Sequence, residues 1–324
     1  MSRNKAFDLL KIFFTIVIVV HHTGYFAGIL NRGYIAVEFF FITSGYFLYQ
    51  TYKKDKSLST VEFFKKRAER LYPEYWFAFV LIFFALTALH ALPYQNWYSP
   101  ILEFLMLHSI GLPGAKAMNN PTWYLSVLIT GSPIIFYMLR KLSRKMFCII
   151  ALIVIVITYL YLVTHSANIE QWDTVGYVFF IPFWRGLADM LIGTLLAQVP
   201  EPSNRVYPQI LECCSLAGVL LFLMLPGNYD YLTVILIILL VWSLRSGESV
   251  LRRIGNVSII DRFGKYQYSV YVNHASVLWV FQTYMSSRGI NAWILTFVVL
   301  LTVFVVAVAD KTIIDKIKPK IAML

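Results

Sequence analysis

The chain has 324 residues, of which 59% are hydrophobic and only 14% are charged. Soluble domains carry about 25% charged residues, so this composition excludes an ordinary soluble protein and favours a membrane protein. The formal net charge of +11 does not indicate nucleic acid binding, because the basic residues gather in short loops between apolar runs.

Repeated apolar runs predict an all-α polytopic bundle with about ten transmembrane helices, and the whole chain, 1–324, is expected to form one transmembrane domain. The MSRNK start leads directly into the first run without a small-residue cleavage site, so this run is expected to be a retained span and not a signal peptide. The expected spans are 7–28, 34–52, 71–92, 122–140, 146–164, 175–199, 209–226, 229–245, 266–287 and 291–313.

Positive charge predicts the orientation of these spans. Lysine and arginine concentrate in the segments 53–70, 140–145 and 245–265 and in the C-terminal tail, whereas 164–173 has none. With ten spans all the basic segments lie on one side, which the positive-inside rule makes cytoplasmic, and both termini face that side. The segment 97–110 is too short to cross and predicts a re-entrant or interfacial helix on the outer side. The segments 58–70 and 247–263 predict amphipathic helices on the cytoplasmic surface.

Ionisable residues interrupt the first two spans, where they are costly and therefore point to function. His21 is expected about 10 Å below the outer end of the first span, and Glu38 at a similar depth in the second. The two could form a general base in which the carboxylate orients the imidazole; the alternative is a packing histidine bonded to a carbonyl. His22 points about 100° away around the helix and is interpreted as a structural neighbour.

Basic residues near the predicted cytoplasmic ends are candidates for phosphate contacts. Lys11, close to Asp8, either faces the bundle interior or extends to the interface as lysines do. Arg67 and Arg70 precede the entry into the third span, where they would meet lipid headgroups or the phosphates of a nucleotide.

Four further positions are candidates for substrate contacts in later spans. Arg185 lies mid-span with Asp189 at i+4, which predicts either a buried structural ion pair or a cation that lines a polar cavity. His274 follows Tyr271 in an aromatic segment, where packing is the alternative. Trp123 and Ser126 begin the fourth span, and interfacial anchoring is the alternative for the tryptophan.

Familiar soluble motifs are absent from the sequence: it has no Gly-rich phosphate loop, GxSxG, HExxH or CxxC. Cys148, Cys213 and Cys214 lie in apolar runs without the spacing of a disulfide framework or a zinc site, and no metal is expected.

Six segments, taken in order, resemble a known family. They are FDLLK with a histidine ten residues after its lysine, GYIAVEFFFITSGYFL (33–48), FFKKRAERLYPEYW (63–76), PTWYLSVL (121–128), FWRGLADMLIGTLL (183–196) and FGKYQYSVYVNHASVL (263–278). Together they resemble the membrane-bound acyltransferase family 3 from about residue 5 to about residue 310.

The resemblance implies transfer of an acyl group, usually acetyl, from cytoplasmic acyl-CoA to a hydroxyl of a sugar or of a lipid-linked or cell-surface glycan across the membrane. It implies that His21 is essential and that Glu38, Arg67 and Arg70 match family positions, whereas Lys11 stands where the family usually has arginine. It also implies the stand-alone type without an extracytoplasmic hydrolase-like domain, and a bacterial cytoplasmic membrane. A homo-oligomer is left open.

The expected mechanism places the CoA nucleotide at the basic cytoplasmic mouth and threads its pantetheine arm toward His21, roughly 15 Å along the helix from Lys11. His21 then removes the acceptor proton or carries the acyl group itself. One rival hypothesis is a proton-coupled transporter that uses the intramembrane charges, although no two matching halves are evident. Another is a lipid-binding or sensor protein without turnover.

Overall fold

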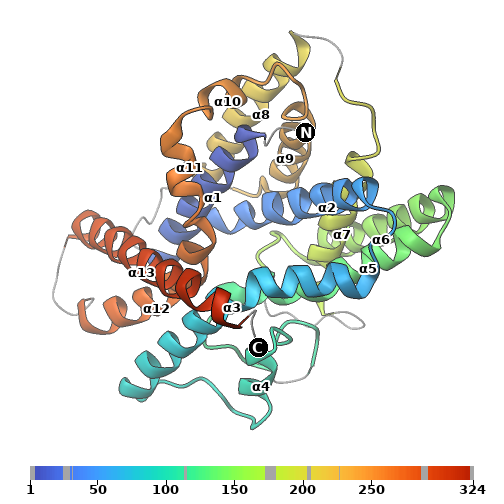
Figure 1. Ribbon diagram of the computed structural model, residues 1–324. Coiled ribbons are helices and arrows are strands. Elements are labelled where there is room, and N and C mark those ends of the chain that lie inside the picture. Colours follow the sequence, from blue (N-terminus) through green and yellow to red (C-terminus); the bar gives the residue numbers. More distant parts are fainter. Residues whose placement is uncertain are drawn as a thin grey trace.

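The computed structural model describes residues 4–24, 30, 32–112, 115–171, 180–202, 206–225, 227–285 and 291–321, except for the side chains of 284, 285, 292 and 319–321 (Figure 1). The protein is an all-helical polytopic bundle, as predicted. Its α-helices are α1 (Lys5–Thr23), α2 (Ala36–Lys54), α3 (Thr60–Ala88), α4 (Ser99–Phe104), α5 (Trp123–Lys141), α6 (Arg144–His165), α7 (Ile181–Leu196), α8 (Tyr207–Met224), α9 (Asp230–Ser243), α10 (Val250–Ile254), α11 (Ser258–Gly264), α12 (Gln267–Met285) and α13 (Ala292–Ile321). Two short 3₁₀ helices, η1 (Gly33–Ile35) and η2 (Asn120–Thr122), lead into α2 and α5.

Each of the ten expected spans overlaps one of these helices, and the parts at 25–28, 175–179, 226 and 286–287 lie outside the described residues. Not all of these helices are apolar enough to be recognised as spans by themselves. In the described part of the chain, six helices are long and apolar enough to cross a membrane: α1, α3, α5 with η2, α6, α8 and α13. The remaining four are α2, α7, α9 and α12. Helices α2 and α7 are largely buried by their neighbours and can therefore carry charged residues away from lipid. The count of ten spans stays a prediction.

The centre of the bundle is the contact between α2 and α7, where two glycines let the helix backbones touch. A Cβ on Gly45 would lie 1.9 Å from the Met190 carbonyl oxygen, and one on Gly193 would lie 1.8 Å from the Ile42 carbonyl oxygen. Small residues at such contacts are the usual way in which membrane helices pack closely. Figure 1 shows α2 running across the molecule from the side of α1 to the side of α6 and α7. This contact places residues of α2 directly against α7.

The third span begins earlier than the hydropathy pattern predicts. A capping box between Ser59 and Glu62 starts α3, and the helix continues without a break through Pro73 to Ala88. The expected amphipathic piece over 58–70 is therefore the first part of α3 and not an element of its own, because the cap sets the helix start before the apolar stretch begins. Its place on the cytoplasmic surface stays a prediction. The expected surface helix over 247–263 is also divided, into α10 and α11.

The segment 97–110 contains only the six-residue α4, which packs against the side of α3. The Tyr75 hydroxyl donates to the Glu103 carbonyl at 2.5 Å, and the Trp76 indole N–H donates to the Phe104 carbonyl at 3.0 Å. These residues lie twelve or more positions before the end of α3, which is roughly 18 Å along its axis. This contact fixes the segment against α3, and the choice between a re-entrant and an interfacial helix stays a prediction.

Candidate functional site

His21 lies in the last turn of α1. The helix ends at Gly24, whose φ of 64° lies in the left-handed region and whose N–H donates to the His21 carbonyl at 3.1 Å. The 3₁₀ turn η1 then packs on the histidine, because a Cβ on Gly33 would lie 2.4 Å from the His21 Cβ. The glycine that opens the GYIAVEFF segment thus allows the chain to approach the imidazole closely.

Three histidines from two helices gather at this end of α1, and we call His21, His22 and His274 the histidine cluster. The ring centroids of His21 and His22 are 5.2 Å apart. His22 and His274 stack with centroids 5.2 Å apart and an interplanar angle of 11°. The sequence interpretation of His22 as a mere neighbour missed this stack, because it requires the unpredictable contact between α1 and α12.

His274 is fully buried, and its hydrogen bonding defines its tautomer. Its Nδ1 lies 2.5 Å from the Tyr271 carbonyl oxygen, which can only accept, so Nδ1 carries the proton. Its Nε2 therefore carries a lone pair that can accept a hydrogen bond. This nitrogen has no hydrogen-bond partner among the described residues. The cluster thus holds a buried, unprotonated nitrogen beside His22.

The carboxylate beside His21 is Glu170, not Glu38. Glu170 Oε1 lies 3.7 Å from His21 Nε2, and the two side chains are 43% and 16% exposed. Glu38 is fully buried in α2 and pairs with Arg185 of α7, with Oε1 3.1 Å from Nε. The expected His21–Glu38 pair is thus corrected, because a buried guanidinium requires a nearby counter-charge and the close contact of α2 with α7 supplies Glu38.

Arg185 organises a buried network. Its guanidinium also lies over the Trp123 ring, 4.7 Å from the centroid, and its Nη1 donates to the Ile169 carbonyl. The expected Arg185–Asp189 pair is replaced, because Asp189 accepts a 2.5 Å hydrogen bond from the Tyr159 hydroxyl of α6. Of the two alternatives for Arg185, a buried ion pair and a cation that lines a polar cavity, the structure favours the buried ion pair. The same guanidinium also holds the backbone of a second segment.

That segment is the stretch 166–171, which carries Glu170. The Ile169 N–H donates to Asp230 Oδ2 at 3.0 Å, and Asp230 also pairs with Arg32 at 2.9 Å and with the Tyr34 hydroxyl at 2.8 Å. Tyr34 in turn lies edge-on to His21, with centroids 5.6 Å apart. The residue before Glu170 is therefore fixed from both sides, by α7 and by α9. No motif or spacing marks Glu170 in the sequence, which explains why it was missed.

A row of aromatic residues runs from the histidine cluster toward α3, the helix that carries Arg67 and Arg70. The rings of Tyr271 and His274 have centroids 5.7 Å apart, and those of Tyr124 and Tyr271 have centroids 5.8 Å apart. Tyr124 lies on α5, which packs against α3. The predicted residues Tyr271 and His274 thus belong to one row that points toward the predicted arginines.

Other predicted residues lie outside this row. Lys11 Nζ lies over the Phe47 ring, 4.6 Å from its centroid, and Trp123 belongs to the Arg185 network. Ser126 is buried, and its hydroxyl accepts from the Ser109 N–H at 2.9 Å, which anchors the segment that follows α4. Across the described residues, no group of three or more histidine, cysteine, aspartate or glutamate side chains could hold a metal ion.

Comparison with known proteins gives one match. The family model described as "Acyltransferase domain" (Acyl_transf_3) matches residues 4–310, nearly the whole chain. No curated protein and no solved structure matches the chain.

Proposed function

Because this chain belongs to the family of the Acyl_transf_3 acyltransferase domain, and is therefore an acyltransferase built as a multi-pass membrane protein, we propose that it transfers an acyl group, typically acetyl, from cytoplasmic acyl-CoA to a hydroxyl on the other side of the membrane. The acceptor is a sugar or a lipid-linked glycan, and the membrane is the cytoplasmic membrane of a bacterium. The observation that carries this proposal is the histidine cluster at the end of α1, from which the rings of Tyr271 and Tyr124 extend toward α3, the helix of Arg67 and Arg70.

The donor end of the proposed path is basic. Arg67 and Arg70 lie on α3, which begins after the lysine-rich stretch 53–56. Arginine forks bind phosphate with two parallel hydrogen bonds, which suits the nucleotide of CoA. From there the pantetheine arm runs beside Tyr124 and Tyr271 to the histidine cluster. Lys11 contributes a point charge from α1.

The acceptor end is His21 with Glu170. The acceptor hydroxyl oxygen bonds to the thioester carbonyl carbon while its proton passes to His21 Nε2. The carbon–sulfur bond then breaks, and the proton moves from His21 to the departing CoA sulfur, which leaves an ester and free CoA thiol. Glu170 stabilises the imidazolium that forms between these two steps. A two-step route, in which His21 itself first accepts the acyl group, uses the same residues.

Arg185 and Glu38 act as positioning residues in this proposal. They do not face the reacting atoms; Arg185 holds the Ile169 carbonyl and so places the adjacent Glu170. Residues that hold a catalytic side chain from behind keep it close to the position that transfer requires.

The test is His21→Ala in membranes that contain the chain and are supplied with labelled acetyl-CoA. General-base help is worth about 10²–10⁴-fold, so we expect transfer to fall by at least about 100-fold. His165→Ala is the matched control, because His165 is an exposed histidine at the end of α6 that stacks only on Tyr161 of its own helix among the described ring contacts. Undiminished transfer by His21→Ala would remove this histidine from the mechanism.

A further inference from the structure

Asp230 begins α9, and it is a fully buried carboxylate whose two oxygens both accept hydrogen bonds. Its Oδ1 accepts from Arg32 Nη1 at 2.9 Å, and its Oδ2 accepts from the Tyr34 hydroxyl at 2.8 Å and from the Ile169 N–H at 3.0 Å. The positive end of the helix dipole also favours an ionised carboxylate in this first turn. A buried charge with several partners holds them firmly, because loss of one contact leaves a polar group without compensation.

Two of these three donors belong to segments that contact His21. Tyr34 lies in η1, and its ring stands edge-on to the imidazole with centroids 5.6 Å apart. Ile169 directly precedes Glu170, whose Oε1 lies 3.7 Å from His21 Nε2. The aromatic neighbour and the acidic neighbour of His21 are therefore attached to the same carboxylate.

Arg185 holds the same stretch of backbone but does not link it to η1 in this way. Its guanidinium binds the Ile169 carbonyl, whereas Asp230 binds the Ile169 N–H. Asp230 also binds Tyr34, which packs on the imidazole. It therefore joins the two sides of the site, while Arg185 supports one of them.

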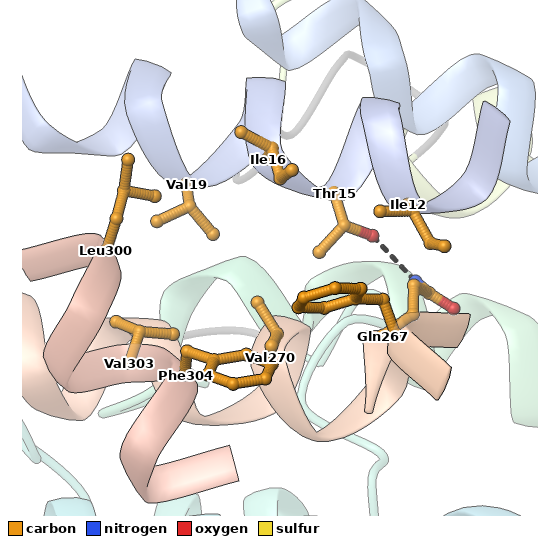
Figure 2. A pocket seen from close by; sticks show the side chains of 10 residues that line it. Ile12, Thr15, Ile16, Val19, Gln267, Val270, Leu300, Val303 and Phe304 are labelled. Carbon is orange, nitrogen blue, oxygen red and sulfur yellow. Dashed lines mark hydrogen bonds between the residues drawn. The ribbon is translucent and has the colours of Figure 1, made fainter. Parts of the chain in front are cut away.

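The backbone of His21 is held from another direction. The Gln267 amide of α12 donates to the Thr15 hydroxyl of α1 at 2.7 Å, and Figure 2 shows this bond at one end of the apolar groove between α1, α11, α12 and α13. A Cβ on Gly33 would instead approach the Val17 carbonyl and the His21 Cβ. At about 100° per residue these positions lie on the opposite face of α1 from Thr15. Loss of the buried carboxylate is therefore expected to change the surroundings of the imidazole without displacing α1.

We propose that Asp230 is a positioning residue for the transfer. By holding Tyr34 and the backbone before Glu170, it fixes the orientation of the imidazole and the place of its counter-charge. The inference rests on the proposed acyl transfer. Asp230 acts through these neighbours, because its hydrogen bonds among the described residues go to the three donors named above and not to the imidazole. A displacement of about 1 Å can cost a catalytic step about 100-fold, so this support affects turnover although the base itself stays intact.

The first test measures placement without turnover. In a full-length variant without native cysteines, a nitroxide on Glu170→Cys reports the motion of the stretch 166–171 by electron paramagnetic resonance. Asp230→Asn should sharpen this spectrum, because the amide offers one acceptor oxygen in place of two. Glu212→Gln is the matched control and should leave the spectrum unchanged, because Glu212 is also a buried carboxylate but accepts from the Leu251 N–H at the start of α10. An unchanged spectrum in Asp230→Asn would overturn the inference.

A second variant covers a failure of Asp230→Asn to fold. That change leaves the buried Arg32 guanidinium without its counter-charge, whereas Arg32→Gln combined with Asp230→Asn removes both charges together. The double variant loses the same anchor, so the same sharpening of the spectrum is expected. A spectrum like that of the parent protein would overturn the inference here as well.

Turnover gives the second test, through a double-mutant cycle with Glu170→Gln. Asp230→Asn should lower kcat about tenfold. It should leave KM for acetyl-CoA within about twofold, because the proposed donor path follows Tyr124 and Tyr271 and not α9. In the Glu170→Gln background the same change should cost only about threefold, since part of its effect is already lost. A merely structural carboxylate gives equal factors in both backgrounds, and equal factors would overturn the inference.

The two tests separate this inference from the function on which it rests. A sharpened spectrum in Asp230→Asn with no transfer to any acceptor by the wild type contradicts the proposed acyl transfer. Transfer that depends on His21, together with an unchanged spectrum or equal factors in the cycle, contradicts the role of Asp230 alone.

Discussion

At the residue scale, the glutamates Glu38 and Glu170 have different roles. Glu38 is fully buried and balances the charge of Arg185, whereas Glu170 is partly exposed beside His21. Removing one partner of a buried ion pair leaves the other charge without compensation, which typically costs about 3–5 kcal/mol. Removing an exposed partner costs little stability but changes the surroundings of the imidazole.

We therefore expect Glu38→Gln and Glu170→Gln to separate stability from transfer. Glu38→Gln should lower the apparent melting temperature of the purified protein clearly, because it uncouples α2 from α7. Glu170→Gln should leave the melting temperature near that of the wild type and reduce transfer about tenfold or more, which is less than the about 10²–10⁴-fold of the base itself because Glu170 only stabilises the imidazolium. Tryptophan fluorescence during heating and labelled acetyl transfer measure the two quantities. The opposite pattern would restore Glu38 as the partner of His21.

At the element scale, the stretch that joins α3 to α5 is held by buried polar groups. The Glu103 carboxylate accepts from the N–H groups of Met118 and Asn119 at 2.8 and 2.9 Å and from the Tyr94 hydroxyl at 2.8 Å. Burial raises the pKa of Glu103, and the three hydrogen bonds oppose that rise. Hydropathy predicts that this stretch is too short to cross, but it cannot predict which donors will surround a single carboxylate.

His108 in the same stretch makes stability depend on pH. Burial lowers its pKa to about 4, against 6.5 for an exposed histidine, and its Nε2 lies 3.3 Å from the Thr122 hydroxyl. Between these values the unfolded chain binds the proton and the folded chain does not, so stability falls as pH decreases from 6.5 to 4. At about 1.4 kcal/mol per pKa unit, this histidine accounts for a loss of about 3.5 kcal/mol at most.

His108→Gln should flatten that dependence, because the amide can still bond to Thr122 but does not titrate. The measurement is the apparent melting temperature of the wild type and the variant from pH 7 to pH 4. We expect the melting temperature of the wild type to fall more steeply with decreasing pH than that of the variant. Curves that stay parallel across this window would show that the folded protein accommodates a charged His108.

At the scale of the whole molecule, periodicity and hydropathy predict the helices well and the site only in part. Each expected span has its helix, because the length of an apolar run depends only on local sequence. The pairing of Glu38 with Arg185, the stack of His22 on His274 and the approach of Glu170 to His21 depend on which helices touch. Matching depth, the basis for expecting His21 beside Glu38, constrains the position along the membrane normal but not the position around the bundle.

The transfer proposed here also requires that the basic stretch before α3 and the stretch 166–171 lie on opposite sides of the membrane. Ten spans place them so, with Lys56 inside and Ala167 outside, and both residues are exposed. In a variant without native cysteines, Ala167→Cys should react with a membrane-impermeant maleimide in intact cells. Lys56→Cys should react only after permeabilisation. Equal reaction of both in intact cells would contradict the ten-span arrangement, and with it any route by which a cytoplasmic thioester crosses the bundle to His21.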